Sequence, residues 1–194
     1  MAAEKKVRFG LKKVHYALLE TDGTYGTPKP WTGAVALTLT PEGDSSAFYA
    51  DDGPYAQFVV NGGYTGSLEM AVLEPQIAAD LLGEAKDAIG GVYEDADAQP
   101  APFALLFEIG GNVNQERYVL YSCKMSRPTR ESGTTTESTD PNTVTMDFTA
   151  IPKEMKIGED TKNVTKYVLE DAEASHTVFA AWFDEVKTPT AAAA

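Results

Sequence analysis

Apolar and polar residues alternate with a period of two along much of the chain, which predicts short β-strands. In residues 143–149, for example, Val144, Met146 and Phe148 alternate with threonines and Asp147. Such alternation places one face of a strand in a core and the other in water. The same pattern recurs in residues 14–19, 33–40, 64–73 and 117–125, separated by turns rich in Gly, Pro, Asn and Asp. Residues 102–109 are apolar until Glu108, as expected of a central strand that is covered on both faces.

Turn residues between these segments predict where the strands end. Pro41–Gly43 is expected to terminate the strand over residues 33–40, because proline and glycine both weaken a strand interior. The glycine- and asparagine-rich run Gly110–Asn114 predicts a hairpin loop between the central strand and the strand after it.

Two segments have helical rather than strand character. Glu74–Gly83 has Pro75 at the first helical position and a glycine just past the end, with an apolar stripe between them. Near the C-terminus, Ser175 is a candidate N-cap for a second helix, although a strand over residues 176–183 fits as well. The apolar residues at helical spacing there are Val178, Phe179, Trp182, Phe183 and Val186. The predicted class is mainly β, with a short flanking helix and a candidate C-terminal helix.

One connection is long for a compact domain. Residues 127–142 are polar and threonine-rich, and they lie between two well-patterned strands. Such a loop is either a functional arm or a mobile surface loop, and composition does not separate the two. We predict one domain over residues 1–194, and its parts are an N-terminal arm (1–12), this extended loop (127–142), a C-terminal segment (153–190) and a frayed tail (191–194).

Charge excludes some partners. The 194 residues include 16 basic and 29 acidic side chains, for a net charge of −13. A protein that grips nucleic acid by neutralising phosphates needs an excess of Lys and Arg, so this class is disfavoured. The ends and interior contain no apolar run long enough for a signal peptide or a membrane span, which favours the cytoplasm of the producing cell.

Catalytic and metal-binding signals are weak. The single Cys123 cannot form an intrachain disulfide and lies on the apolar face of a predicted strand, where a free cysteine is usually inert. The acidic runs Asp51–Gly53 and Glu94–Asp97 lack the ligand spacing of a calcium loop, and Ser67 is not in a Gly-x-Ser-x-Gly turn. We therefore expect no enzyme activity, no metal and no cofactor.

Several short motifs, taken in order, resemble a known family. They span about residues 7–152, and each is weak alone, whereas their order is more specific. The motifs are Gly10–Ala17, Gly33–Leu37, Pro41–Gly43, Phe48–Tyr55, Asn61–Glu69, Leu81–Gly83, Phe103–Glu108, Ser126–Pro128 and Asp147–Pro152. In these motifs the chain resembles the phi13-type major tail protein of long-tailed, non-contractile bacteriophages. Residues from Lys153 onward are less diagnostic, and no appended immunoglobulin-like domain is evident.

The resemblance implies a structural virion protein made in the cytoplasm of a bacterial host. Family members fold as two antiparallel sheets packed into a sandwich or squashed barrel with a flanking helix. Six subunits form a ring, and the rings stack into a hollow tail tube through which phage DNA passes without specific binding. The implied partners are other copies of the chain, the tape measure protein, the tail terminator and the distal tail protein, with no membrane involved.

Two sets of residues gain a role from this resemblance. Polar residues on strand faces, among them Ser67, Glu69, Thr145 and Asp147, are candidates to line the tube lumen. Residues of the extended loop and the N-terminal arm are candidates for contacts between subunits or rings. This second set is Arg130, Glu131, Thr134, Thr135, Thr136, Glu137, Lys5 and Arg8.

Another class of protein remains as an alternative. A monomeric β-sandwich that binds a ligand such as a carbohydrate is expected to present several aromatic residues on one exposed strand face. The two tryptophans do not provide such a platform, since Trp31 lies in a proline-rich loop and Trp182 in the predicted C-terminal helix.

Overall fold

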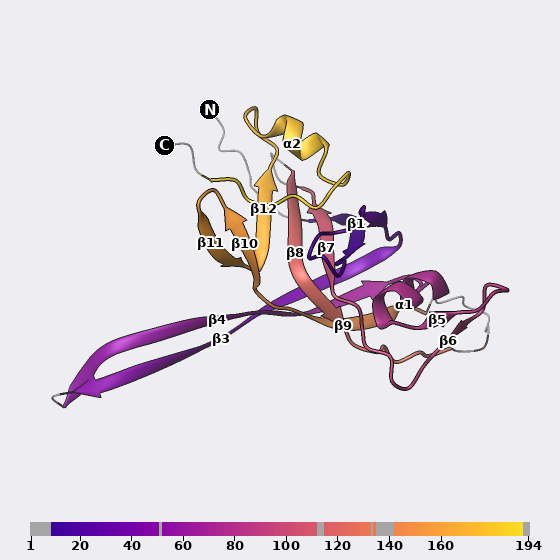
Figure 1. Ribbon diagram of the computed structural model, residues 1–194, viewed down its shortest axis with the longest axis horizontal. Helices are drawn as coiled ribbons and strands as arrows, with labels where there is room; N and C mark the ends of the chain where they lie inside the picture. The colour runs from indigo at the N-terminus through magenta and orange to yellow at the C-terminus, as the bar shows by residue number, and fades with distance from the viewer. Residues whose placement is uncertain (1–8, 51, 112–114, 133, 135–141, 192–194) are drawn as a thin grey trace.

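The computed structural model describes residues 9–50, 52–111, 115–132, 134 and 142–191 (Figure 1). Antiparallel strands dominate it, which confirms the prediction of a mainly β fold with a short helix. The strands are β1 (Leu11–Leu18), β2 (Lys29–Pro30), β3 (Ala34–Ala50), β4 (Gly53–Met70), β5 (Ala85–Lys86), β6 (Val92–Tyr93), β7 (Phe103–Ile109), β8 (Glu116–Met125), β9 (Val144–Ala150), β10 (Lys153–Ile157), β11 (Asp160–Val164) and β12 (Lys166–Glu170). The helices are α1 (Pro75–Leu82) and α2 (His176–Ala180).

The main sheet has the strand order β2-β1-β7-β8-β9-β4-β3, with β12 as an additional partner of β8. The first half of β8 pairs with β12, and its last three residues pair with β9. Between the two halves, Ser122 adopts a left-handed backbone conformation with φ of 47°. The same edge of β8 therefore passes from one neighbour to another, and the sheet divides there into two wings.

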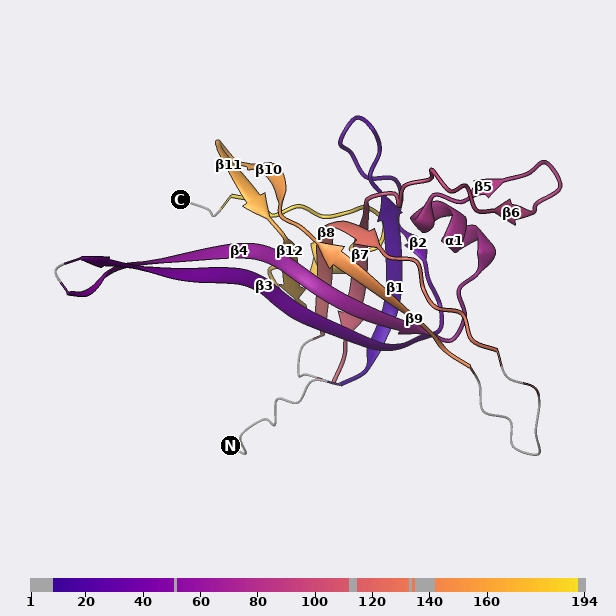
Figure 2. The same cartoon turned by 90° about the horizontal axis from the view of Figure 1, so that it is seen from below.

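The two wings enclose the larger core, which gives the sandwich-like arrangement. Strands β1, β7 and β8 supply one side, β4 and β9 supply the other, and α1 closes one end. Leu68, Phe103 and Met146 are fully buried in it. Strand β1 also contacts β3, so the wings approach each other at their outer edges (Figure 2).

A second, smaller core covers the reverse face of β7 and β8. Trp182 is fully buried there against Leu106, Val119 and Tyr121, and its indole N–H donates to the Tyr118 carbonyl. Because both faces of β7 are covered, its residues are almost all buried, as the apolar run over residues 102–109 predicted.

The helices follow the sequence in part. Helix α1 has Pro75 in its first turn, and Gly83 ends it with φ of 74°, as predicted. Helix α2 confirms the candidate C-terminal helix and excludes the alternative strand, but it ends at Ala180. Trp182 lies beyond it, in a turn that places the indole in the second core. Neither helix of the described chain has the length and apolar character that a membrane crossing requires.

The long strands β3 and β4 correct the sequence-based boundaries. Pro41 was expected to end the strand over residues 33–40, but β3 continues to Ala50 and pairs Pro41 with Tyr64. In the main sheet β3 is the edge strand next to β4, and an edge strand is where sheets tolerate proline. Likewise β4 begins at Gly53, well before the predicted strand start at Tyr64. The C-terminal segment 153–190 holds three further strands, β10 to β12, that were not predicted.

A buried charge network fastens the C-terminal segment to the sheet. The Glu108 carboxylate on β7 is fully buried and lies 2.8 Å from Nε of Arg117, 3.1 Å from Nζ of Lys13 and 3.2 Å from Nζ of Lys12. The Arg117 guanidinium also donates to the Phe179 carbonyl and lies over the Phe179 ring, 3.9 Å from its centroid. Helix α2 is thus tied to β7 and β8 through one arginine.

Candidate assembly surfaces

Beyond the last pair between β4 and β9, strands β3 and β4 leave the body as a two-stranded ribbon. The β4–β9 ladder ends at Tyr64 and Ala150, whereas β3–β4 pairing continues to Ala50 and Gly53. We call residues 43–62 the arm. In Figures 1 and 2 it projects far from the body, away from α1, β5 and β6.

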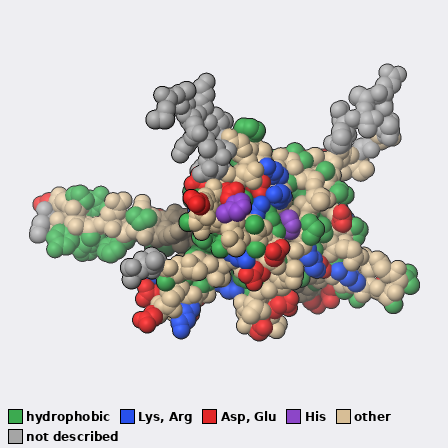
Figure 3. Space-filling view, turned by 90° about the horizontal axis from the view of Figure 1, so that it is seen from above, with side chains coloured by type: hydrophobic (Ala, Val, Ile, Leu, Met, Phe, Trp, Pro, Cys, Tyr) green, Lys and Arg blue, Asp and Glu red, His purple; other side chains and the backbone are tan. Residues whose placement is uncertain are grey.

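Large apolar side chains lie along the arm in full view of solvent (Figure 3). Six of them are between 57% and 76% exposed, namely Phe48, Tyr49, Tyr55, Phe58, Val59 and Val60. The cross-strand pairs Phe48–Ala56, Ser46–Phe58 and Asp44–Val60 share one face of the ribbon, so that face is largely apolar.

A two-stranded ribbon that packs on nothing else has little stability of its own. Two-stranded hairpins are marginally stable in water without a third strand or a packed face. Exposed apolar patches of this extent mark interaction sites in soluble proteins. The sequence pattern does not predict the arm because Pro41 and Gly43 are strand-terminating residue types. The runs Phe48–Ala50 and Phe58–Val60 carried the strand signal.

Glycines shape the base of the arm. Gly63 has φ of 107°, and a Cβ there would lie 2.1 Å from the Ala150 carbonyl oxygen. A Cβ on Gly43 would lie 2.4 Å from the Val60 carbonyl oxygen, next to a register shift between Glu42 and Gly43. Close backbone approach therefore requires glycine where the ribbon bends out of the sheet.

Alanine at Gly63 is expected to destabilise the protein by about 2 kcal/mol or more, because it adds both an unfavourable φ and a steric clash. Thermal or chemical unfolding measures the loss. Gly53→Ala is the matched control on the same strand, since a Cβ there meets nothing within 4 Å. Equal stability of the two variants would contradict the tight packing at the arm base.

The second surface is a polar face formed by the outer sides of β3, β4 and β9. Ser67 lies opposite Thr38 on one side and Asp147 on the other, and Glu69 lies opposite Thr145. The structure thus brings together all four residues that the sequence nominated for the lumen. Thr145 and Asp147 are exposed, and Ser67 and Glu69 are partly buried. That this face lines the lumen of an assembly stays a prediction.

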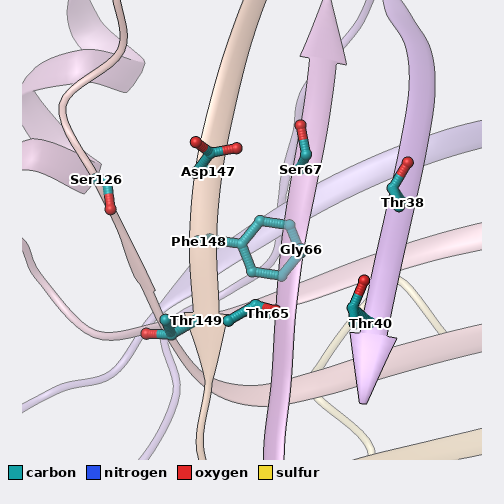
Figure 4. Close-up of a pocket in the computed structure, with 9 residues that line it drawn as sticks. All are labelled: Thr38, Thr40, Thr65, Gly66, Ser67, Ser126, Asp147, Phe148 and Thr149. Carbon is teal, nitrogen blue, oxygen red and sulfur yellow. The ribbon is translucent and has the colours of Figure 1, made fainter. Parts of the chain in front are cut away.

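A shallow groove of about 360 Å³ crosses the polar face (Figure 4). Its floor is Gly66, where the Phe148 ring occupies the space of a side chain. The rest of the lining is mostly hydroxyl groups with one carboxylate, from Thr38, Thr40, Thr65, Ser67, Ser126, Asp147 and Thr149. These lining residues include no histidine, cysteine or lysine.

Of the extended loop, the structure describes residues 127–132, 134 and 142. Arg130, Glu131 and Thr134 are exposed, and Glu131 lines a second groove together with Thr145 and Asp147. One predicted contact residue thus lies beside two predicted lumen residues. The other nominated contacts, Thr135, Thr136, Glu137, Lys5 and Arg8, lie outside the described residues.

Other reactive groups are held in structural roles. Cys123 is fully buried, and burial raises the pKa of its thiol far above normal, as expected of an inert core cysteine. Burial alone would raise the pKa of Asp80, but hydrogen bonds from Lys29, Lys86 and the Tyr16 hydroxyl outweigh it and lower the pKa. No group of three or more metal-ligating side chains occurs within the described ranges.

No protein-family model matches the chain, and no curated protein gave a significant match.

Proposed function

We propose that this protein is a structural subunit that assembles with copies of itself into stacked hexameric rings, forming the tail tube of a long-tailed bacteriophage. One observation supports the self-assembly. The arm exposes six large apolar side chains, and within the described residues its two strands pair only with each other. The phage tail identity rests on the motif resemblance. On this proposal the protein resides in the virion tail and needs no cofactor or catalytic site.

Charge supports a channel function. The net charge is −13 per copy, and the polar face carries Glu69 and Asp147. DNA repels an acidic wall, which would keep it from binding during passage. Screening limits this repulsion to about 8 Å at physiological salt. The repulsion therefore prevents DNA from sticking to the wall at short range and does not drive its transport.

Assembly is tested on the purified protein by light scattering and negative-stain electron microscopy over a range of concentrations. Rings or hollow tubes that accumulate with concentration are expected, because the apolar arm gains free energy only when a second copy covers it. A protein that stays monomeric at the highest concentration would contradict self-assembly.

The alternative is a monomeric binding module, for instance one for carbohydrate. Phe48, Tyr49, Tyr55 and Phe58 on the arm are exposed aromatics of the kind the two tryptophans do not supply. A monomer whose arm tyrosines change fluorescence with an oligosaccharide would favour this alternative. The same titration without a response, beside visible rings, would favour the tube subunit.

The polar face gives a separate prediction about DNA. The double variant Glu69→Lys and Asp147→Lys is expected to assemble and to retain linear DNA in a co-sedimentation assay, because the reversed charges attract phosphates. Wild-type assemblies are expected to leave the DNA in the supernatant. Glu154→Lys with Asp160→Lys, on β10 and β11, changes the net charge equally and serves as the control. Equal retention by both double variants would place the polar face elsewhere than the lumen.

A further inference from the structure

Strand β1 is irregular near its start, at Lys12 and Lys13, and the need to neutralise Glu108 does not explain this irregularity. Successive side chains of a regular strand point to opposite faces, so Lys12 and Lys13 would not reach the same group. A register shift lies between Lys12 and His15, and Lys13 has φ of 52°, in the left-handed region that non-glycine residues seldom adopt. The bulge lets both lysines contact one carboxylate.

The result is a local surplus of positive charge. Three cations, Lys12, Lys13 and Arg117, surround the single carboxylate of Glu108. Arg117 is buried beneath the Phe179 ring, but the two lysine side chains are 46% and 49% exposed. We call Lys12, Lys13, Arg117 and Glu108 the basic patch. A strained backbone that adds a cation beyond the need of its partner indicates a role at the surface.

The arm of this protein has the complementary chemistry. Residues 43–62 include Asp44, Asp51 and Asp52 and no lysine or arginine. Asp52 is exposed at the tip, where Tyr49 and Tyr55 add apolar surface. Beside the basic patch, Phe9 is 66% exposed and its N–H donates to the Gly110 carbonyl. An acidic tip with aromatic flanks therefore matches a basic site with an apolar neighbour.

We propose that Lys12 and Lys13 bind the Asp52 carboxylate on the arm tip of a second copy of this chain. The arm projects away from the body that bears it, so its tip does not reach the basic patch of the same copy (Figures 1 and 2). Two different surfaces meet in this contact, and such heterologous contacts generate rings or filaments. The inference rests on the proposed self-assembly and names one of its interfaces.

A zero-length crosslink tests the contact directly. Copies labelled with ¹⁵N are assembled with unlabelled copies and treated with a carbodiimide, which joins a carboxylate to a touching amine as an amide. Mass spectrometry is expected to find the peptide containing Asp52 linked to Lys12 or Lys13, with one partner labelled and the other not. Assemblies whose Asp52 peptide links only to other lysines would overturn this contact and leave self-assembly standing. Absence of any assembly by the wild type would overturn both.

A double-mutant cycle tests the same contact without a crosslinking reagent. Asp52→Asn and the pair Lys12→Gln with Lys13→Gln are each expected to raise the concentration of half-assembly about three- to tenfold. Combined, they are expected to cost no more than the lysine pair alone, because a contact is lost once. Lys156→Gln, an exposed lysine on β10, is the control and should not shift assembly. Additive effects of Asp52→Asn and the lysine variants would overturn the proposal, and Asp52→Asn stays interpretable because it is remote from Glu108.

Discussion

Serine at Phe48, Phe58 and Val60 together is expected to abolish assembly while the body of the protein stays folded. The three side chains lie on one face of the arm and are exposed in the monomer. Each is worth about 1.5 kcal/mol or more when a partner buries it, so the triple variant loses about 4 kcal/mol or more of contact free energy. That corresponds to about a thousandfold in the association constant. Electron microscopy and light scattering at wild-type assembly concentrations measure the loss.

The control for this variant removes three exposed apolar residues elsewhere. Val72, Ile89 and Val178 are exposed on the body and are replaced by serine together. This control is expected to assemble as the wild type does. Both triple variants should unfold within a few degrees of the wild type, because surface substitutions change stability little. Normal tubes from the arm variant would remove the arm from the assembly interface.

The second large effect is expected on stability, from Glu108→Gln. The change removes the carboxylate while Arg117 stays buried beneath Phe179, and an unpaired buried charge typically costs about 3–5 kcal/mol. In a chain of this size that lowers the melting temperature by roughly 10 °C. Calorimetry or circular dichroism measures it. Glu185→Gln breaks an exposed ion pair with Lys187 and should change the melting temperature little.

The same carboxylate predicts a pH dependence. Burial alone would raise the pKa of Glu108, but hydrogen bonds from Arg117, Lys13 and Lys12 outweigh it and lower the pKa. A glutamate in the unfolded chain has a pKa of about 4.3, so the stabilisation is complete above that pH and is lost as the pH falls toward the lowered pKa of the folded state. Melting temperatures of Glu108→Gln and the wild type should converge under acid. A constant difference down to the lowest measurable pH would contradict this assignment.

The local sequence pattern was sufficient to predict the secondary structure of segments that pack against a continuous core. The period of two in residues 117–125 and 143–149 anticipated β8 and β9, because one face of each meets the core and the other meets water or the second layer. Pro75 and Gly83 located α1 because both act within a single turn. Those same alternations put Ser67 and Glu69 on the polar face of one strand and Thr145 and Asp147 on that of another, and the β4–β9 register places the four side by side.

The sequence pattern did not predict the arm or the charge network, because both depend on which strands are neighbours. Proline is excluded from central strands but tolerated in edge strands, and only the tertiary structure shows that β3 is an edge strand. In the sequence Glu108 is the polar end of an apolar run. In the structure, strand pairing places Lys12 on one side of it and Arg117 on the other.

The sequence by itself determined a mainly β, acidic chain, the positions of its central strand and first helix, and the residues of its polar face. Those features follow from contacts a few residues apart. The tertiary structure alone decided that residues 43–62 leave the body as an arm with apolar side chains in water. It alone also decided that Lys12, Lys13 and Arg117 converge on one carboxylate. Such features arise between segments distant in the chain, where the pairing and register of strands determine which side chains meet.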